Sequence, residues 1–215
     1  MLQSSQTEAL ASPLAAGTGH RRTHGFGLPD DAFEQRRPVR GQITKSEVRA
    51  VSLYALGLRS DSVVWDIGSG TGSIAVEAAQ IAYCGRIYAI DKDTNNAELL
   101  ENNVAKYGDG RVSVVIGAAP DVLRDLPDPD SVFVGGGGAA TPAIIETAVR
   151  RLRAGGWLVA NFAVMERAGS TYQALKNAAM SPEMTMITAA RGRELPDGAL
   201  RLEAMNPVFV VWGQK

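Results

Sequence analysis

Two acidic residues and a run of glycines are the part of this sequence best suited to binding a ligand. Asp66 ends a short apolar segment, and the residues after it include Gly68, Gly70 and Gly72. Glycine has no Cβ, so a turn built from glycines lets backbone N–H groups approach a ligand closely. Asp91 lies nineteen residues beyond Gly72, near the spacing of about 20 residues at which a carboxylate accepts hydrogen bonds from ribose hydroxyls. The pattern predicts a site for a cofactor that contains a nucleoside.

The position of the third glycine separates two classes of cofactor. A dinucleotide-binding turn has the pattern Gly-x-Gly-x-x-Gly, which would need a glycine where this chain has Ser73. The charge of Asp66 would also disfavour a pyrophosphate, whereas it could accept hydrogen bonds from amides of the turn or help to hold an aminoacyl group. The pattern Asp-x-Gly-x-Gly-x-Gly resembles motif I of S-adenosylmethionine-dependent methyltransferases. We therefore expect S-adenosylmethionine; plain turn glycines and a helix-capping role for Asp91 are the structural alternatives.

Alternating strand-like and helix-like segments must position these residues. Short apolar runs typical of buried parallel strands lie at residues 63–67, 86–91, 112–116, 131–134 and 157–164. Thr44 and Glu47 have capping-box spacing, and Thr141 precedes a proline, so both threonines predict helix starts. Two late strands around the turn-rich residues 195–198 predict an antiparallel closing pair. The expected fold is α/β, a Rossmann-like class I methyltransferase with a seven-stranded, mostly parallel sheet and a C-terminal antiparallel hairpin.

Length and composition place this fold in one domain. The 215 residues suffice for a single sizeable core. Residues 1–27 are rich in Ser, Ala, Gly and Thr without an apolar period, so we predict a disordered tail or linker there and the methyltransferase domain at 28–215. His20 and His24 lie in that tail without a nearby cysteine or carboxylate, and we expect no metal site.

Charge and cysteine content suggest the compartment and exclude some partners. The formal net charge of -1 gives no overall basic field for nucleic acid. No stretch approaches the roughly 20 apolar residues of a membrane span. Cys84 is the single cysteine, which rules out an internal disulfide framework and fits a reducing compartment. We expect a cytoplasmic protein with no nucleic-acid or membrane partner.

Several segments resemble one family more closely than the fold alone requires. These segments are residues 28–33, 41–50, 64–73, 132–138 and 205–209. They are similar to the decarboxylating precorrin (C15) methyltransferases of cobalamin biosynthesis, which occur as stand-alone proteins and as the C-terminal half of precorrin-6Y C5,15-methyltransferase. The resemblance covers about residues 28–213, and its most particular motifs are Thr-Lys-x-Glu-Val-Arg from Thr44 and Asn-Pro-Val from Asn206.

This resemblance implies an activity and a set of cofactor contacts. The activity is methylation of carbon 15 and decarboxylation of the carbon 12 acetate side chain of a precorrin-6B-type intermediate. The family contacts carry onto Thr44, the glycine turn, Asp91 and Ala118; small residues near Ala118 could also let adenine lie against the backbone, although they suit a tight turn equally. The predicted cofactor-binding residues are Thr44, Asp66, Gly68, Ser69, Gly70, Thr71, Gly72, Asp91, Lys92, Gly117, Ala118 and Ala119.

The implied substrate is a tetrapyrrole with several carboxylates, so we expect arginines at its cleft. Candidate substrate contacts are Gly136, Gly137, Asn161, Arg191, Arg193 and Arg201; for the arginines, solvated loop charges are the alternative. We name no catalytic residue, because the methyl sulfonium is already a strong electrophile and the enzyme mainly aligns the nucleophilic carbon with it. A covalent nucleophile is not expected.

The resemblance leaves several points open. It implies a homotetramer, and the residues before position 28 are too few for the N-terminal carbon 5 methylase of the two-domain enzymes. Residues 28–33 resemble the two-domain type more closely, which implies an excised domain or a split gene product that supports the carbon 15 half alone. Alternatives are a tRNA adenine or isoaspartyl protein methyltransferase, a nicotinamide-dependent oxidoreductase, or a cofactor-binding module without catalysis.

Overall fold

A seven-stranded sheet forms the centre of the protein. In the computed structural model, which describes residues 27–36, 41–136 and 138–215, the strands lie in the order β3-β2-β1-β4-β5-β9-β6. Their bounds are β1 (Val63–Ile67), β2 (Arg86–Asp91), β3 (Val112–Ile116), β4 (Ser131–Gly135), β5 (Trp157–Phe162), β6 (Glu183–Ile187) and β9 (Val208–Gln214). The strands from β3 to β5 pair in parallel, and β9 pairs antiparallel with β5 and β6. The expected Rossmann-like sheet is confirmed. Residues 1–26, with both histidines, and Gly137 lie outside the described residues.

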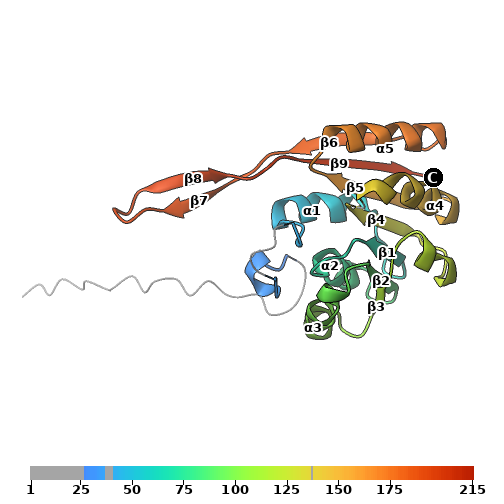
Figure 1. Cartoon of the computed structure of the whole chain (residues 1–215), viewed down its shortest axis with the longest axis horizontal. Helices are drawn as coiled ribbons and strands as arrows, with labels where there is room; N and C mark the ends of the chain where they lie inside the picture. Colours follow the sequence, from blue (N-terminus) through green and yellow to red (C-terminus); the bar gives the residue numbers. More distant parts are fainter. Residues whose placement is uncertain (1–26, 37–40, 137) are drawn as a thin grey trace, which may run out of the picture.

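Helices cover both faces of the sheet (Figure 1). They are α1 (Ser46–Ala55), α2 (Ser73–Ile81), α3 (Ala97–Tyr107), α4 (Thr141–Arg151) and α5 (Met165–Asn177). The first three contribute to one buried cluster and the last two to another, on the opposite face of the sheet. The short 3-10 turns η1 (Asp30–Ala32), η2 (Thr94–Asn96), η3 (Asp121–Asp125) and η4 (Gly138–Ala140) connect these elements. Because helices shield both faces, the central strands are mostly apolar, which explains why their boundaries were predictable.

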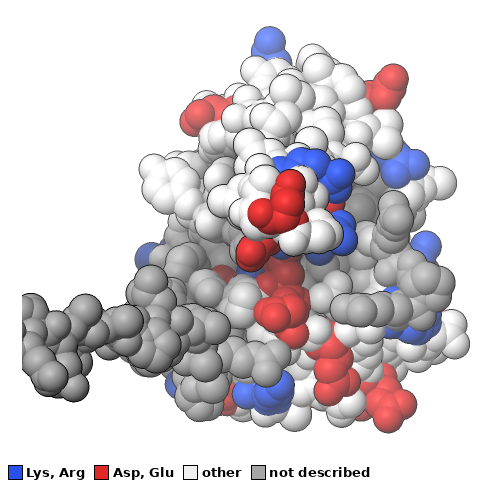
Figure 2. Space-filling view, turned by 90° about the vertical axis from the view of Figure 1, so that its left-hand side faces the viewer, with Lys and Arg blue, Asp and Glu red and all other residues white. Residues whose placement is uncertain are grey.

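A two-stranded ribbon projects from the sheet edge (Figure 1). It pairs β7 (Ala190–Glu194) antiparallel with β8 (Leu200–Ala204). The sequence predicted that the turn at residues 195–198 would separate the sheet's own closing strands. The antiparallel pair around this turn is confirmed as β7 and β8, but it stands apart from the sheet, which β9 and β6 close. Seen from the side to which the ribbon projects, charged side chains of both signs crowd the middle of the molecule (Figure 2).

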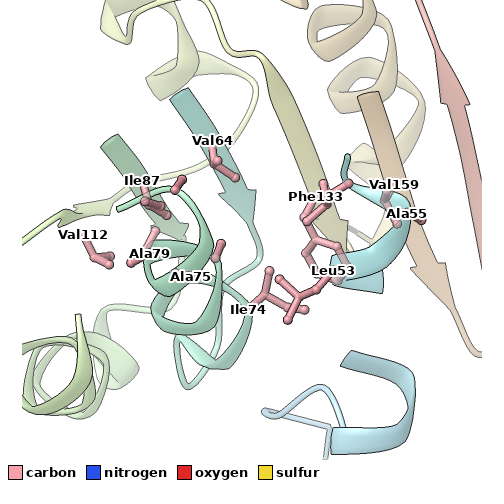
Figure 3. Packing of buried hydrophobic residues seen from close by; sticks show 14 of the residues in the cluster. Leu53, Ala55, Val64, Ile74, Ala75, Ala79, Ile87, Val112, Phe133 and Val159 are labelled. Atoms are coloured by element: carbon pink, nitrogen blue, oxygen red, sulfur yellow. The ribbon is translucent and has the colours of Figure 1, made fainter. Parts of the chain in front are cut away.

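The cluster between the sheet and helices α1 and α2 shows how the sequence pattern becomes a core (Figure 3). Leu53 of α1 and Ile74 of α2 lie beside Phe133 of β4, and all three are buried. Val64 of β1 faces the same cluster, whereas Trp65, the next residue along the strand, belongs to the cluster on the other face. This alternation places Asp66 on the same face as Val64, beneath α2.

Two predicted helix caps are wrong. The helix expected from the Thr44 and Glu47 pair begins at Ser46 and has no side-chain cap from Lys45; instead, the Asp30 carboxylate accepts a hydrogen bond from the Ser46 amide at 3.0 Å. At the other site, Thr141 is the first helical residue and its hydroxyl donates to the carbonyl of residue 138 at 2.9 Å. A carboxylate distant in sequence has taken the capping role, which no local pattern could reveal.

The strand order reverses between β1 and β4. From β1 the chain continues to β2 on one side of the sheet, and β4 lies on the other side of β1. The chain leaves β1 at Gly68 and leaves β4 at Gly135, so the two ends meet there. A Cβ on Gly68 would lie only 2.5 Å from the carbonyl oxygen of Gly135. Ligands of open α/β sheets bind outside the strand ends at such a switch point, so the geometry directs attention to this place.

The close approach at Gly68 gives a test with a matched control. Gly68 and Gly155 have almost the same positive φ, 78° and 77°, but a Cβ on Gly155 would meet no atom within 4 Å. Gly155→Ala should therefore lower the free energy of unfolding by about 1–2 kcal/mol, the cost of the left-handed conformation. Gly68→Ala should lose about 1–3 kcal/mol more, because it also forces two backbones apart. Equal losses in urea denaturation would show that the contact with β4 is unimportant.

Candidate functional site

Two adjoining clefts lie outside the carboxyl ends of β1 and β4. The first cleft has a volume of about 340 Å³, and the second about 250 Å³. They share the lining residues Gly41, Gln42, Gly68 and Gly135. The first cleft is lined in addition by Ile67, Gly70, Ile90, Asp91, Lys92, Asn96, Gly117, Ala118, Ala119, Ala140 and Ile144. The second is lined in addition by Ile43, Thr44, Lys45, Val48, Ser69, Gly136, Asn161, Phe162, Ala163 and Val208.

Most of the candidate residues line these clefts, although the sequence could not tell which lie in which cleft. Those at the first cleft are Gly68, Gly70, Asp91, Lys92, Gly117, Ala118 and Ala119. Those at the second are Thr44, Gly68, Ser69, Gly136 and Asn161. Asp66, Thr71 and Gly72 line neither cleft, and the first two are fully buried beneath the turn.

The glycine turn is held by the protein's own backbone and offers few free amides. The amides of Gly68 and Ser69 both donate to the carbonyl of Ile90, at 2.8 and 3.0 Å. Gly70 donates to Asp91 Oδ2 at 2.7 Å. The Thr71 amide donates to the carbonyl of Gln42 at 3.0 Å. The turn glycines thus allow close backbone packing and leave the floor of the cleft without side chains. This corrects the expectation that their N–H groups are free to bind a ligand.

The Asp91 carboxylate is fixed at the edge of the first cleft. Its Oδ2 accepts the Gly70 amide, and its Oδ1 accepts the amide of Asp93 at 2.9 Å. Each carboxylate oxygen has two lone pairs, so the side chain can still accept hydrogen bonds from a ligand. The nearby Asp93 carboxylate accepts the Asn95 amide at 3.0 Å and so begins the turn before α3.

Asp66 acts beneath the turn and not inside a cleft. It is wholly buried, and its Oδ2 accepts hydrogen bonds from Ser69 Oγ at 2.6 Å and from the Ala75 amide at 3.1 Å. Oδ1 has no partner among the described residues. Burial raises the pKa of Asp66 to about 7, while the two hydrogen bonds partly oppose that rise. The Asp66 side chain therefore connects the turn to α2, and its protonation affects the free energy of unfolding.

The raised pKa of Asp66 predicts a pH dependence of stability. In the unfolded chain this carboxyl group loses its proton near pH 3.8, whereas in the folded protein it keeps the proton until about pH 7. The folded state therefore binds more protons in this window, so the free energy of unfolding should fall as pH rises, by up to about 1.4 kcal/mol per pH unit. Asp66→Asn should remove this component. The free energy of unfolding is measured by urea denaturation from pH 4 to 8 for the wild-type protein and Asp66→Asn. If it changes with pH in the same way for both, the assignment to Asp66 is contradicted.

Two asparagines that line the clefts each have a buried side-chain oxygen without a partner among the described residues. These oxygens are Oδ1 of Asn96, which lines the first cleft, and Oδ1 of Asn161, which lines the second. Asn161 Nδ2 donates to Ser52 Oγ at 2.8 Å, which fixes the orientation of the amide. A buried polar atom without a partner is costly, so both oxygens are candidate acceptors for ligand donors. Asn96 was not predicted from the sequence, because nothing distinguishes it from an ordinary residue of a short polar turn.

The walls shared by the clefts depend on residues 41–45, which we call the lip segment. A buried Arg49 holds it: one guanidinium nitrogen donates to the carbonyl of Thr44 at 2.7 Å, and Nε pairs with Glu77 at 2.8 Å. Asn103 of α3 donates to the carbonyl of Thr71 at 3.0 Å and so braces the glycine turn from the other side. The sequence motif contained Arg49, but only the structure shows that its partner is on α2.

The three candidate arginines line neither cleft. Arg191 forms a paired hydrogen bond with Glu47 at 2.6 and 2.8 Å and a third with Asp30 at 2.8 Å. These bonds hold the pKa of the Glu47 carboxyl down at about 2. Arg193 and Arg201 both pair with Glu203 on the exposed ribbon, at 2.9 and 2.7 Å. Arg191 thus anchors the ribbon to α1, and none of the three reaches the clefts in this structure.

Two further findings concern only the residues that the structure describes. In that part of the chain no group of three or more His, Cys, Asp or Glu side chains is placed to hold a metal ion. Nor does that part contain a helix with the length and apolar character needed to cross a membrane.

Comparisons with known proteins agree on one family. A family model described as a precorrin methyltransferase domain matches residues 31–212. A probable cobalt-precorrin-6B C(15)-methyltransferase (decarboxylating) of Pyrobaculum calidifontis is 42% identical over 187 residues, which cover 86% of this chain and 94% of the relative. The precorrin-6Y C(5,15)-methyltransferase [decarboxylating] of a Sinorhizobium species is 39% identical over 69% of this chain but only 32% of its own length. The crystal structure of a precorrin-6y C5,15-methyltransferase from Geobacter metallireducens superposes with a TM-score of 0.82 at 34% identity, covering 88% of this chain and 98% of that one.

Proposed function

The chain belongs to the precorrin methyltransferase domain family, and we propose that it methylates carbon 15 and decarboxylates the carbon 12 acetate side chain of a precorrin-6B-type intermediate in cobalamin biosynthesis. The observation that carries the proposal is the pair of adjoining clefts with a common glycine wall at the switch point of the sheet. A methyl donor in one cleft and an acceptor in the other would lie side by side where the clefts adjoin, as direct methyl transfer requires. The relatives named above act, by their names, on such precorrins.

S-adenosylmethionine is the methyl donor that we propose for the first cleft. When bound, it would supply an electrophilic methyl sulfonium. Asp91 would accept hydrogen bonds from the ribose hydroxyls, residues 117–119 would lie against the adenine, and the unsatisfied Asn96 Oδ1 offers a further buried acceptor. The fit is supported by the Asp91 carboxylate, which lines this cleft and whose two oxygens each accept one backbone amide and keep lone pairs for hydroxyl donors.

We propose the second cleft as the place of the reacting edge of the tetrapyrrole. Apolar residues make up much of its wall, including Ile43, Phe162 and Val208. Loss of carbon dioxide from an acetate side chain needs an electron sink, which a conjugated protonated macrocycle can itself provide. The chain's own contribution would then be alignment of the nucleophilic carbon and exclusion of water. Gly136 and the fixed amide of Asn161 remain candidate substrate contacts at this wall.

The alternative functions lack a specific observation in their favour. A tRNA adenine methyltransferase should present a basic stripe, but the face toward which the ribbon projects has a run of acidic side chains down its middle, with basic ones to either side (Figure 2). A nicotinamide dinucleotide would need a glycine where this chain has Ser73. A cofactor-binding module without catalysis is left as an outcome of the assay below.

We also propose that the chain forms a homo-oligomer, for which the family resemblance suggests a tetramer. What supports this is the ribbon: Leu200 and Leu202 lie on one face of β8 and are 77% and 72% exposed. Across the ribbon Leu202 pairs with Gly192, which has no side chain, and Leu200 pairs with Glu194. A two-stranded ribbon is barely stable by itself, and exposed apolar surface of this kind is typical of contact sites. A cytoplasmic location remains part of the proposal, since a single cysteine needs no oxidising compartment.

The proposed reaction is tested by supplying cobalt-precorrin-6B or precorrin-6B together with S-adenosylmethionine. The product mass should show the gain of one methyl group and the loss of one carbon dioxide, with S-adenosylhomocysteine formed in equal amount. Methylation without decarboxylation would limit the activity to the transfer step. Cofactor binding without any change in the tetrapyrrole would favour a non-catalytic module instead.

Asp91 is the residue with which to test the cofactor assignment. Asp91→Asn should weaken binding of S-adenosylhomocysteine by about 1–3 kcal/mol, because hydrogen bonds to a charged acceptor are lost. Asp93→Asn is the control, since that neighbouring carboxylate does not line the first cleft. Titration calorimetry with the wild-type protein and both variants measures the difference. Equal affinity in all three would remove Asp91 from the site, and tight binding of NAD instead would overturn the methyltransferase assignment.

A further inference from the structure

Lys45 is the one charged residue among the described residues that line the second cleft. It belongs to the lip segment and lies directly before α1. The other polar side chains of this cleft are uncharged: Gln42, Thr44, Ser69 and Asn161. The second cleft therefore has cationic character, while the first contains a carboxylate and an amine in Asp91 and Lys92. A cleft with a single cation at its lip is suited to an anionic ligand.

The only ion pair of Lys45 among the described residues is weak and can be given up. Its Nζ lies 3.7 Å from Asp30 Oδ2, beyond hydrogen-bond distance, and its side chain is 45% exposed. Asp30 has better partners: Arg191 at 2.8 Å, the Ser46 amide at 3.0 Å and Arg49 at 3.4 Å. Because these contacts already compensate the Asp30 charge, Lys45 can turn to a ligand without leaving a buried carboxylate unpaired.

We propose that Lys45 binds a carboxylate that the substrate retains through the reaction. This inference rests on the proposed function, which supplies a substrate with several carboxylates. A cation beside the departing carboxylate would stabilise the charge that decarboxylation must disperse, and would slow the reaction. The departing acetate is better placed against the apolar wall formed by Ile43, Phe162 and Val208, while Lys45 at the lip holds another carboxylate of the same macrocycle. Lys45 thus takes the role that the sequence had suggested for arginines of the ribbon.

The proposed contact of Lys45 and a general electrostatic effect would change different kinetic constants. A contact kept in both the ground state and the transition state contributes to binding only, so its removal raises KM and leaves kcat unchanged. A contact with the departing carboxylate would change kcat. The cofactor cleft should not respond, because Lys45 does not line it.

The experiment compares Lys45→Met, Lys45→Arg and Lys176→Met with the wild-type protein, using cobalt-precorrin-6B and S-adenosylmethionine. Lys176 is an exposed lysine of α5 outside both clefts. We expect Lys45→Met to raise KM for the precorrin roughly 10-fold to 100-fold, as expected for a lost charge-assisted hydrogen bond. Lys45→Arg should recover most of this loss, and Lys176→Met should behave as wild type. The affinity of all proteins for S-adenosylhomocysteine should stay the same, which also shows that they are folded.

The outcomes separate this inference from the proposed function. Unchanged KM for Lys45→Met in an active enzyme would overturn the role of Lys45 and leave the proposed function intact. A change in kcat with constant KM would also overturn it, because it would place Lys45 at the departing carboxylate. A wild-type protein that leaves cobalt-precorrin-6B and precorrin-6B unchanged would overturn the proposed function, and this inference with it.

Discussion

The site depends on one constraint, the direct contact of three backbone segments at the glycine turn. Gly68 lies against the carbonyl of Gly135 at the end of β4, and Gly70 lies against the carbonyl of Gln42 in the lip segment, where a Cβ would come within 2.5 and 2.2 Å. Both contacts forbid a side chain. Because the same backbone atoms line both clefts, the shape of each cleft follows from how closely these segments approach.

A buried ion pair keeps the third of those segments in place. Arg49 and Glu77 are almost fully shielded from solvent, and Glu77 also accepts the Leu28 amide at 3.0 Å while Arg49 donates to the carbonyl of Thr44 at 2.7 Å. Burying two charges costs desolvation energy that their attraction hardly exceeds. What the pair provides is position: it joins α1 and α2 to the chain that forms the outer wall of the clefts. Asp66 likewise holds the turn in position from below, and burial raises the pKa of its carboxyl group.

The two clefts differ in the ligands they can accept. The first is lined by the Asp91 carboxylate and by Asn96, whose side-chain oxygen is buried without a partner among the described residues, and it suits a ligand rich in hydroxyl and amino donors. The second combines apolar walls with a single ammonium group at its lip. This division matches the two ligands that we propose, a nucleoside methyl donor on one side and an anionic macrocycle on the other.

The sequence by itself determined the sheet strands from β1 to β5, the glycine turn and Asp91, because buried strands and tight turns leave local patterns of apolar residues and glycines. It also indicated the family, through motifs such as Thr-Lys-x-Glu-Val-Arg. Tertiary structure decided what those residues do: the turn amides bond to Ile90, Asp91 and Gln42, Asp30 caps α1 in place of Thr44, and the ribbon carries Arg193 away from the clefts. The physical reason is that hydrogen bonds, burial and charge pairing depend on partners distant in the sequence, such as Arg49 and Glu77, whose meeting no local pattern records.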